Sequence, residues 1–132
     1  MERTYSTPLI DKLGVKPGAR VAILGVDDPD FRVALAERTS DVTDGAVAPD
    51  TDVVLLAADT TTDLDRLGGI RRAIRPNGAI WVVSRKGKAA TLCDIEVIGI
   101  AGEHDLVDNK VVSFSATHTA LRLVIPVALR RR

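Results

Sequence analysis

The sequence lacks the features that mark several classes of protein. Its single cysteine, Cys93, has no partner for an intramolecular disulfide and excludes a zinc site made of cysteines alone. No apolar run approaches the ~18 residues needed to cross a bilayer, and the first residues have no apolar stretch of the signal-peptide type. We therefore expect a cytoplasmic protein without a membrane partner.

Aromatic residues and net charge are also scarce. The chain has one tryptophan, one tyrosine and two phenylalanines, and its 18 basic residues balance its 18 acidic residues. A general nucleic-acid binder is usually basic and stacks bases on aromatic rings, so nucleic acid is not the expected partner. The charges are nevertheless separated, because residues 27–65 carry eleven acids and two bases, whereas residues 66–88 carry seven bases and no acid.

The remaining composition is that of a globular domain. Hydrophobic residues make up 45% and charged residues 27% of the 132 positions, the ordinary balance of a folded protein. A chain of this length fits one domain, so we expect a single domain over residues 1–132. Pro126 donates no hydrogen bond and should end the final strand near residue 125, which leaves a basic tail at about residues 128–132.

Continuous apolar runs predict strands that are buried on both faces, as in a parallel sheet. Three such runs cover residues 20–26, 51–58 and 79–84, and a weaker strand is expected at residues 41–43. Capping residues, prolines and helical spacing place helices between them. The expected helices cover residues 8–13, 28–38, 60–75 and 91–103.

Two apolar segments near the C-terminus, residues 110–115 and 120–125, flank a short loop and predict an antiparallel hairpin. The residues Pro76, Asn77 and Gly78 are expected to stop the preceding helix and turn the chain. Strands that alternate with helices indicate an α/β fold with helices on both faces of a mostly parallel sheet. A ligand should then bind beyond the carboxyl ends of the parallel strands.

Residues 15–21, residues 73–78 and the terminal hairpin resemble the class I methyltransferase-like Rossmann fold. The whole chain also resembles a small bacterial family of unknown function with a shortened form of this fold, above all in residues 106–111 and in Leu121 and Arg122. The resemblance implies a three-layer, Rossmann-like sheet of about six strands in the order 2-1-3-4-6-5. It implies no established activity. That family tends to have a tryptophan just before the final strand, and His118 stands near that place here.

Such a fold suggests S-adenosylmethionine as a cofactor, but the residues after the first strand do not suit it. A cofactor loop needs glycines that let the backbone approach the ligand, and here Gly25 stands alone before Val26 and Asp27. Pro29 also removes an amide donor. Asp44, after the second strand, is the acid that could hold a ribose. We expect no cofactor.

Polar residues of both signs follow the carboxyl ends of the strands, where a polar zwitterionic or phosphorylated ligand could bind. The candidate ligand-binding residues are Gly25, Asp27, Asp44, Asp59, Ser84, Arg85 and Lys86. In the alternative interpretation Asp28 and Thr60 are helix caps and the neighbouring acids solvate loops. The basic loop from Arg85 to Lys88 could bind phosphate or be solvated.

A second candidate is the hairpin polar cluster, which consists of Asp108, Asn109, Lys110 and Arg122. Lys110 and Arg122 could pair across strands with Asp108 as a structural clasp, or could face an acidic ligand or partner. His104, His118 and Cys93 have no metal-ligand spacing or catalytic partner that the sequence reveals. We expect no metal and no catalytic residue.

Three functions are compatible with these residues. The first is a non-catalytic Rossmann-like domain that binds a partner or a small ligand at the carboxyl edge of its sheet. The second is a methyltransferase-like enzyme, or an adenosyl or nucleotide binder, with a degenerate glycine loop. The third is a weak anion or nucleic-acid accessory protein that uses residues 85–88 and the tail. Self-association is compatible with all three, and the sequence identifies no surface for it.

Overall fold

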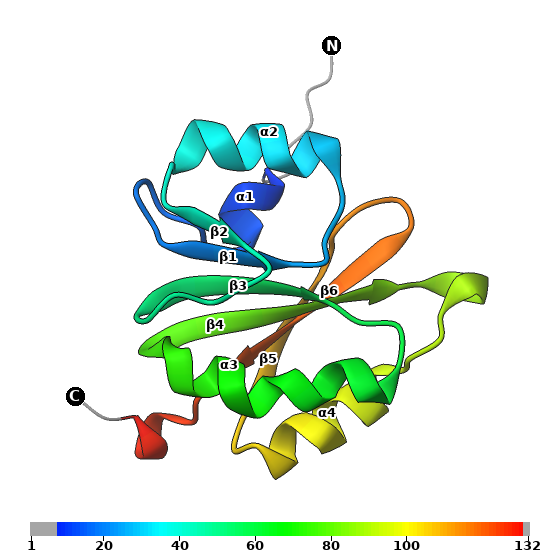
Figure 1. Cartoon of the computed structure of the whole chain (residues 1–132). Helices are drawn as coiled ribbons and strands as arrows, with labels where there is room; N and C mark the ends of the chain where they lie inside the picture. The colour runs from blue at the N-terminus through cyan, green and yellow to red at the C-terminus, as the bar shows by residue number, and fades with distance from the viewer. Residues whose placement is uncertain (1–7, 131–132) are drawn as a thin grey trace.

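The computed structural model describes residues 8–130 and contains one six-stranded sheet with the order β2-β1-β3-β4-β6-β5 (Figure 1). Strands β1 to β4 are parallel to one another. β6 pairs antiparallel with β4, and β5 pairs antiparallel with β6. The strands are β1 (Val21–Leu24), β2 (Val42–Asp44), β3 (Thr51–Ala57), β4 (Ile74–Arg85), β5 (Val107–Ser113) and β6 (His118–Val124). The predicted strand order and fold class are confirmed.

Helices form a layer on each side of the sheet. One side carries α1 (Leu9–Lys12) and α2 (Pro29–Arg38), and the other carries the 3-10 helix η1 (Thr61–Arg66), α3 (Leu67–Ala73) and α4 (Asp94–Glu103) (Figure 1). Side chains alternate along each strand, so Leu55 and Trp81 pack toward α1 and α2, whereas Leu56 and Ile80 pack toward α3 and α4. Short 3-10 helices also form at η2 (Gly87–Ala89) and η3 (Val127–Leu129).

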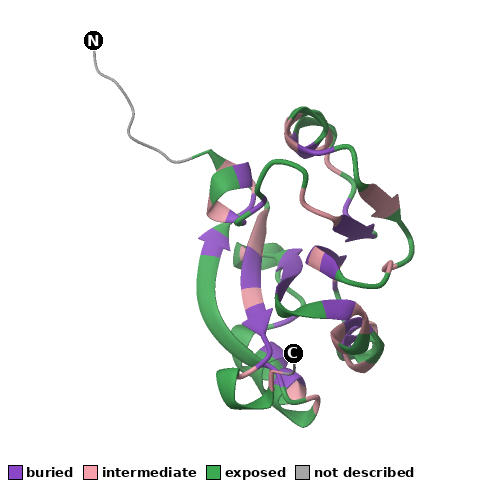
Figure 2. Cartoon of the chain, turned by 90° about the vertical axis from the view of Figure 1, so that its left-hand side faces the viewer, coloured by how far each residue is buried: buried purple, intermediate pink, exposed green. Residues whose placement is uncertain are grey.

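The apolar runs that predicted buried strands are buried. All four residues of β1 are inaccessible to solvent, as are most residues of β3 and β4. The edge strand β5 differs, because most of its length is exposed (Figure 2). α1 is fixed to the sheet by the indole Nε1 of Trp81, which donates to the carbonyl oxygen of Leu13 at 3.0 Å.

One crossover in the parallel part of the sheet has no helix. The chain passes from β1 to β2 through α2, from β3 to β4 through η1 and α3, and from β4 to β5 through α4. Between β2 and β3 it crosses β1 with residues 45–50 alone. Val47 of this segment packs against the core on the α3 side.

The residues Pro76, Asn77 and Gly78, where a turn was expected, lie in an irregular part of β4. α3 ends at Ala73, and β4 begins at Ile74. Ile74 pairs with Thr51 and Ala79 pairs with Val53, so residues 75–78 have no partner in β3. A Cβ atom at Gly78 would lie 3.1 Å from the carbonyl oxygens of Arg75 and Asp52. The chain therefore leaves the ladder where the turn signals stand, but only after Ile74 has paired with β3.

Other boundaries shift by a few residues. β5 covers Val107–Ser113 and β6 covers His118–Val124, so each strand is one residue longer than expected and the loop lies two residues earlier with its length unchanged. The predicted helix at residues 91–103 begins at Asp94. Arg131 and Arg132 of the predicted tail, and the first seven residues, lie outside the described residues. Within residues 8–130 no helix has the length and apolar character that crossing a membrane requires.

Candidate functional site

A small cavity of about 130 Å³ lies where the carboxyl ends of the parallel strands meet the loop between β5 and β6. Because β6 runs antiparallel to β4, Arg85 at the end of β4 is paired with His118 at the start of β6. The hairpin loop therefore returns to this edge of the sheet. The lining residues are Gly25, Val26, Asp27, Asp28, Ala57, Val83, Phe114, Ser115, Thr117 and His118.

The hairpin side of the cavity is held by a local hydrogen-bond network. The Ser115 Oγ accepts from the backbone N–H groups of Thr117 at 3.2 Å and of His118 at 3.1 Å. The hydroxyl of Thr117 lies 2.8 Å from Nδ1 of His118. The imidazole is therefore oriented by its own loop through Nδ1, and its other ring nitrogen makes no hydrogen bond to the described residues.

The other side is closed by the start of α2. Asp28 is the N-cap, and its carboxylate accepts from the backbone N–H of Phe31 at 3.0 Å, which confirms the cap interpretation of Asp28. The buried ring of Phe31 packs against the ring of Phe114 with their centroids 5.2 Å apart. This aromatic pair joins α2 to the hairpin and fills the space beside the cavity.

Of the predicted ligand-binding residues, Gly25 and Asp27 line the cavity and Asp44 does not. The Arg32 guanidinium donates to both carboxylate oxygens of Asp44, one at 2.9 Å, and also reaches the carbonyl oxygen of Val26 at 3.5 Å. These hydrogen bonds hold the pKa of Asp44 below its usual range. The acid that could have held a ribose is therefore bound by a side chain of α2.

The remaining predicted residues, Asp59, Ser84, Arg85 and Lys86, lie near this edge but outside the cavity. Asp59 pairs with Nε of Arg85 at 3.4 Å, Lys86 donates from Nζ to the Ser113 Oγ at 2.7 Å, and Ser84 is buried in β4. None of the four lines the cavity. The bases are therefore not arranged around a common space for a phosphate.

Thr60 is the N-cap of η1, as the alternative interpretation predicts. Its hydroxyl accepts from the Asp63 N–H, and the carboxylate of Asp63 accepts in return from the N–H groups of Asp59 at 2.8 Å and of Thr60 at 3.1 Å. These bonds lower the pKa of Asp63. This part of the acidic segment has a structural role.

The hairpin polar cluster is divided between the two faces of the sheet. Asn109 is the extra residue in a register shift of β5, so that Asp108 pairs with Leu123 on the α3 side while Lys110 pairs with Arg122 on the other side. Within residues 8–130 no ion pair joins Asp108 to either base. Arg122 donates instead to Oδ1 of Asn109 at 3.4 Å.

The sequence does not reveal the contribution of the hairpin, from which Phe114, Ser115, Thr117 and His118 supply four of the ten lining residues. A signal was present, because a final strand antiparallel to its neighbour starts at the edge where that neighbour ends. The described residues contain no cluster of three or more His, Cys, Asp or Glu that could hold a metal ion. Exposed Cys93 lies at the N-cap of α4, where its N–H donates to Glu96 at 3.0 Å.

No family model and no curated protein sequence matches this chain. Solved structures do. A SAM-dependent methyltransferase from Aquifex aeolicus is 13% identical with a TM-score of 0.68, and covers 89% of this chain and 88% of its own. A putative type 11 methyltransferase from Sulfolobus solfataricus is 12% identical with a TM-score of 0.66, and covers 94% and 93%. The predicted resemblance to a methyltransferase-like fold is confirmed.

A third similar structure is the magnesium protoporphyrin IX methyltransferase from Synechocystis with bound SAM. It is 11% identical with a TM-score of 0.58, and covers 89% of this chain and 74% of its own. Identities at this level establish the shared fold alone, since one fold carries many functions.

Proposed function

We propose that this chain is a non-catalytic Rossmann-like domain that binds a small amine-bearing ligand in the cavity between Asp27 and His118. The observation that carries the proposal is the size of the cavity, about 130 Å³. That volume corresponds to about four water molecules, and it lies well below the ~300–1,000 Å³ of sites that enclose larger organic ligands.

The surroundings of the cavity support the exclusion of an adenosyl cofactor. Gly25, with a positive φ of 82°, is the one glycine in the loop between β1 and α2, whereas a cofactor loop needs several. Phe31 and Phe114 occupy the space between α2 and the hairpin. A nucleoside would also have to displace Arg32 from Asp44 before it could use that carboxylate.

The lining favours a cationic or donor-rich ligand over a phosphorylated one. Asp27 is an exposed carboxylate on the lining, whereas Arg85 and Lys86 are bound to Asp59 and Ser113 outside it. A hydrogen bond between an ammonium group and a carboxylate is charge-assisted and roughly twice as strong as a neutral one. The free ring nitrogen of His118 and the hydroxyl of Thr117 supply further polar contacts.

Calorimetric titration with ethanolamine, glycine and S-adenosylmethionine tests the proposal. We expect saturable heat with at least one of the two small amines, with a Kd of about 1 mM or lower, and none with S-adenosylmethionine. Asp27→Asn should remove the binding, whereas Asp30→Asn, a carboxylate of α2 outside this cavity, should leave it unchanged. Micromolar binding of S-adenosylmethionine would overturn the proposal in favour of the methyltransferase-like enzyme.

A further inference from the structure

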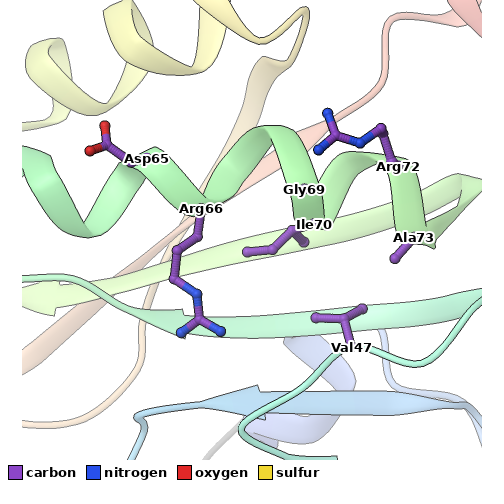
Figure 3. Close-up of a pocket in the computed structure, with 7 residues that line it drawn as sticks. All are labelled: Val47, Asp65, Arg66, Gly69, Ile70, Arg72 and Ala73. Atoms are coloured by element: carbon purple, nitrogen blue, oxygen red, sulfur yellow. The ribbon is translucent and has the colours of Figure 1, made fainter.

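A groove of about 460 Å³ lies on the opposite side of the sheet from α2, between α3 and the helix-free segment that joins β2 to β3 (Figure 3). In a parallel sheet, crossover helices normally cover both faces. The crossover from β2 to β3 supplies only Val47 to this layer. The groove is therefore the place where the helical layer beside α3 stops.

The groove has an apolar floor, and the part of α3 that borders it includes a glycine, which has no side chain. Val47 rises from the β2–β3 segment, and Ile70 and Ala73 face it from α3. Gly69 lies on the same stretch of helix, and a Cβ atom there would meet only Nη2 of Arg72, at 3.8 Å. Another backbone can therefore approach α3 closely along this side.

Two arginines border the groove, and neither has a carboxylate partner among residues 8–130. Five other arginines pair with aspartates, and these are Arg20, Arg32, Arg38, Arg75 and Arg85. Arg66 extends toward the β2–β3 segment, whereas the side chains of Asp65 and Arg72 lie on the other side of the helix from Val47 (Figure 3). The three charged residues of the lining carry a net positive charge.

We propose that this groove docks an acidic amphipathic helix of a partner protein. Its walls are a helix and a loop, so it offers no free strand edge to which an extended peptide could add. α3 and α4 already lie side by side in this layer (Figure 1), and a docked helix continues it. The apolar stripe of such a helix covers Val47 and Ile70, and a carboxylate beside the stripe reaches Arg66, while Arg72 adds positive charge at the rim.

Gly69 gives a test that leaves the fold intact. Gly69→Leu places an apolar side chain in the groove, and its Cβ atom would meet nothing closer than Nη2 of Arg72 at 3.8 Å. The substitution also removes a helix-disfavouring glycine. Gly99→Leu on the exposed face of α4 is the matched control, because a Cβ atom at Gly99 meets nothing within 4 Å. Circular dichroism of both variants verifies that they are folded.

The probe is a fluorescein-labelled peptide of about 16 residues, long enough to form a marginal helix. It carries Leu at helical spacing on one face and Glu on the others. Fluorescence anisotropy should give saturable binding that Gly69→Leu abolishes and Gly99→Leu preserves. Arg66→Glu combined with Arg72→Glu should weaken it by about tenfold or more, and added salt should weaken it further.

Three outcomes would overturn the proposal. They are the absence of saturable binding at ~1 mM protein, equal binding by Gly69→Leu, and equal binding by a peptide of the same composition in scrambled order. A second copy of this chain is the other possible occupant, and sedimentation analysis tests it. Self-association that Gly69→Leu abolishes would assign the groove to that second copy. The amine titration at Asp27 is independent of all these results.

Discussion

Lys110 and Arg122 stand directly opposite each other in the antiparallel pair of β5 and β6, so two cations face each other on one side of the sheet. The oxygen of Asn109, 3.4 Å from Arg122, is the nearest recorded acceptor. Burial, and secondarily the charge of Arg130, lower the pKa of Arg122. Like charges directly opposite in a sheet are destabilising, and the predicted clasp with Asp108 would have avoided this.

Lys110→Glu should therefore stabilise the protein, because it places a carboxylate opposite Arg122. We expect a gain of about 0.5–1 kcal/mol in unfolding free energy, or roughly 2–4 °C in Tm, measured by thermal and urea denaturation. Lys88→Glu in η2 reverses a charge on an exposed residue and should change stability little. A destabilised Lys110→Glu variant would contradict the account.

Asp63 should make stability depend on pH at the acidic end. Its pKa is lowered in the folded state by the N–H groups of Asp59 and Thr60. The stabilisation is therefore fully present above the unfolded value of about 3.9 and is lost as the pH falls through the folded pKa. Asp63→Asn should lower the unfolding free energy by about 0.5–1 kcal/mol at pH 7. In urea titrations at several pH values, the variant should lose less stability than the parent as the pH falls, and this acid-dependent loss is the acid limb.

Asp65→Asn provides the comparison, since Asp65 is exposed and has no recorded hydrogen bond or ion pair within residues 8–130. It should retain the acid limb. Equal loss in both variants would show that the capping box of η1 is not the source of the pH dependence.

Two glycines should respond in opposite directions to alanine. Gly69→Ala on α3 should stabilise by up to about 1 kcal/mol, because alanine has the higher helix propensity. Gly78→Ala should destabilise by about 1–3 kcal/mol, because its Cβ would press against three backbone carbonyl oxygens 3.1–3.2 Å away. Urea denaturation of both variants measures the contrast, and a stable Gly78→Ala would mean that the start of β4 can move.

Trp81→Phe should loosen α1. The substitution leaves the carbonyl of buried Leu13 without its donor, a loss of about 1–3 kcal/mol. Trp81 is the sole tryptophan, so stability is followed by circular dichroism and α1 by amide hydrogen exchange, which should accelerate. Ile80→Val, buried toward α3 and α4, should cost about 0.5–1.5 kcal/mol without accelerating exchange in α1.

The sequence predicts the sheet well because its buried strands are continuous apolar runs, and the resemblance to the methyltransferase-like fold implies their order. It is less exact at residues 74–78, because the preceding helix ends at Ala73 and Ile74 already pairs with Thr51 of β3. Residues 75–78, which carry the local signals for a turn, have no partner in β3. The pairing of Ile74 with Thr51 is a long-range contact, and no local pattern contains it.

The side-chain pairing at the carboxyl edge of the sheet could not be predicted from the sequence. The sequence locates the acids and bases at one edge of the sheet, but it does not reveal that Arg32 binds Asp44 or that Arg85 binds Asp59. Side-chain pairing depends on rotamers and on the distance between loops. The groove beside α3 had a weak signal, since residues 45–50 are too few to form a crossover helix.

The irregularity at Asn109 has a consequence for how the protein behaves in concentrated solution. β5 is the exposed end of the sheet, and a straight, apolar end strand is a template on which other chains assemble into fibrils. The extra residue bends and twists β5 at its middle, and Asp108 and Lys110 place a charge on either side of it. Val107 and Val111 are therefore exposed without forming a flat apolar surface, which disfavours the addition of a further strand at this edge.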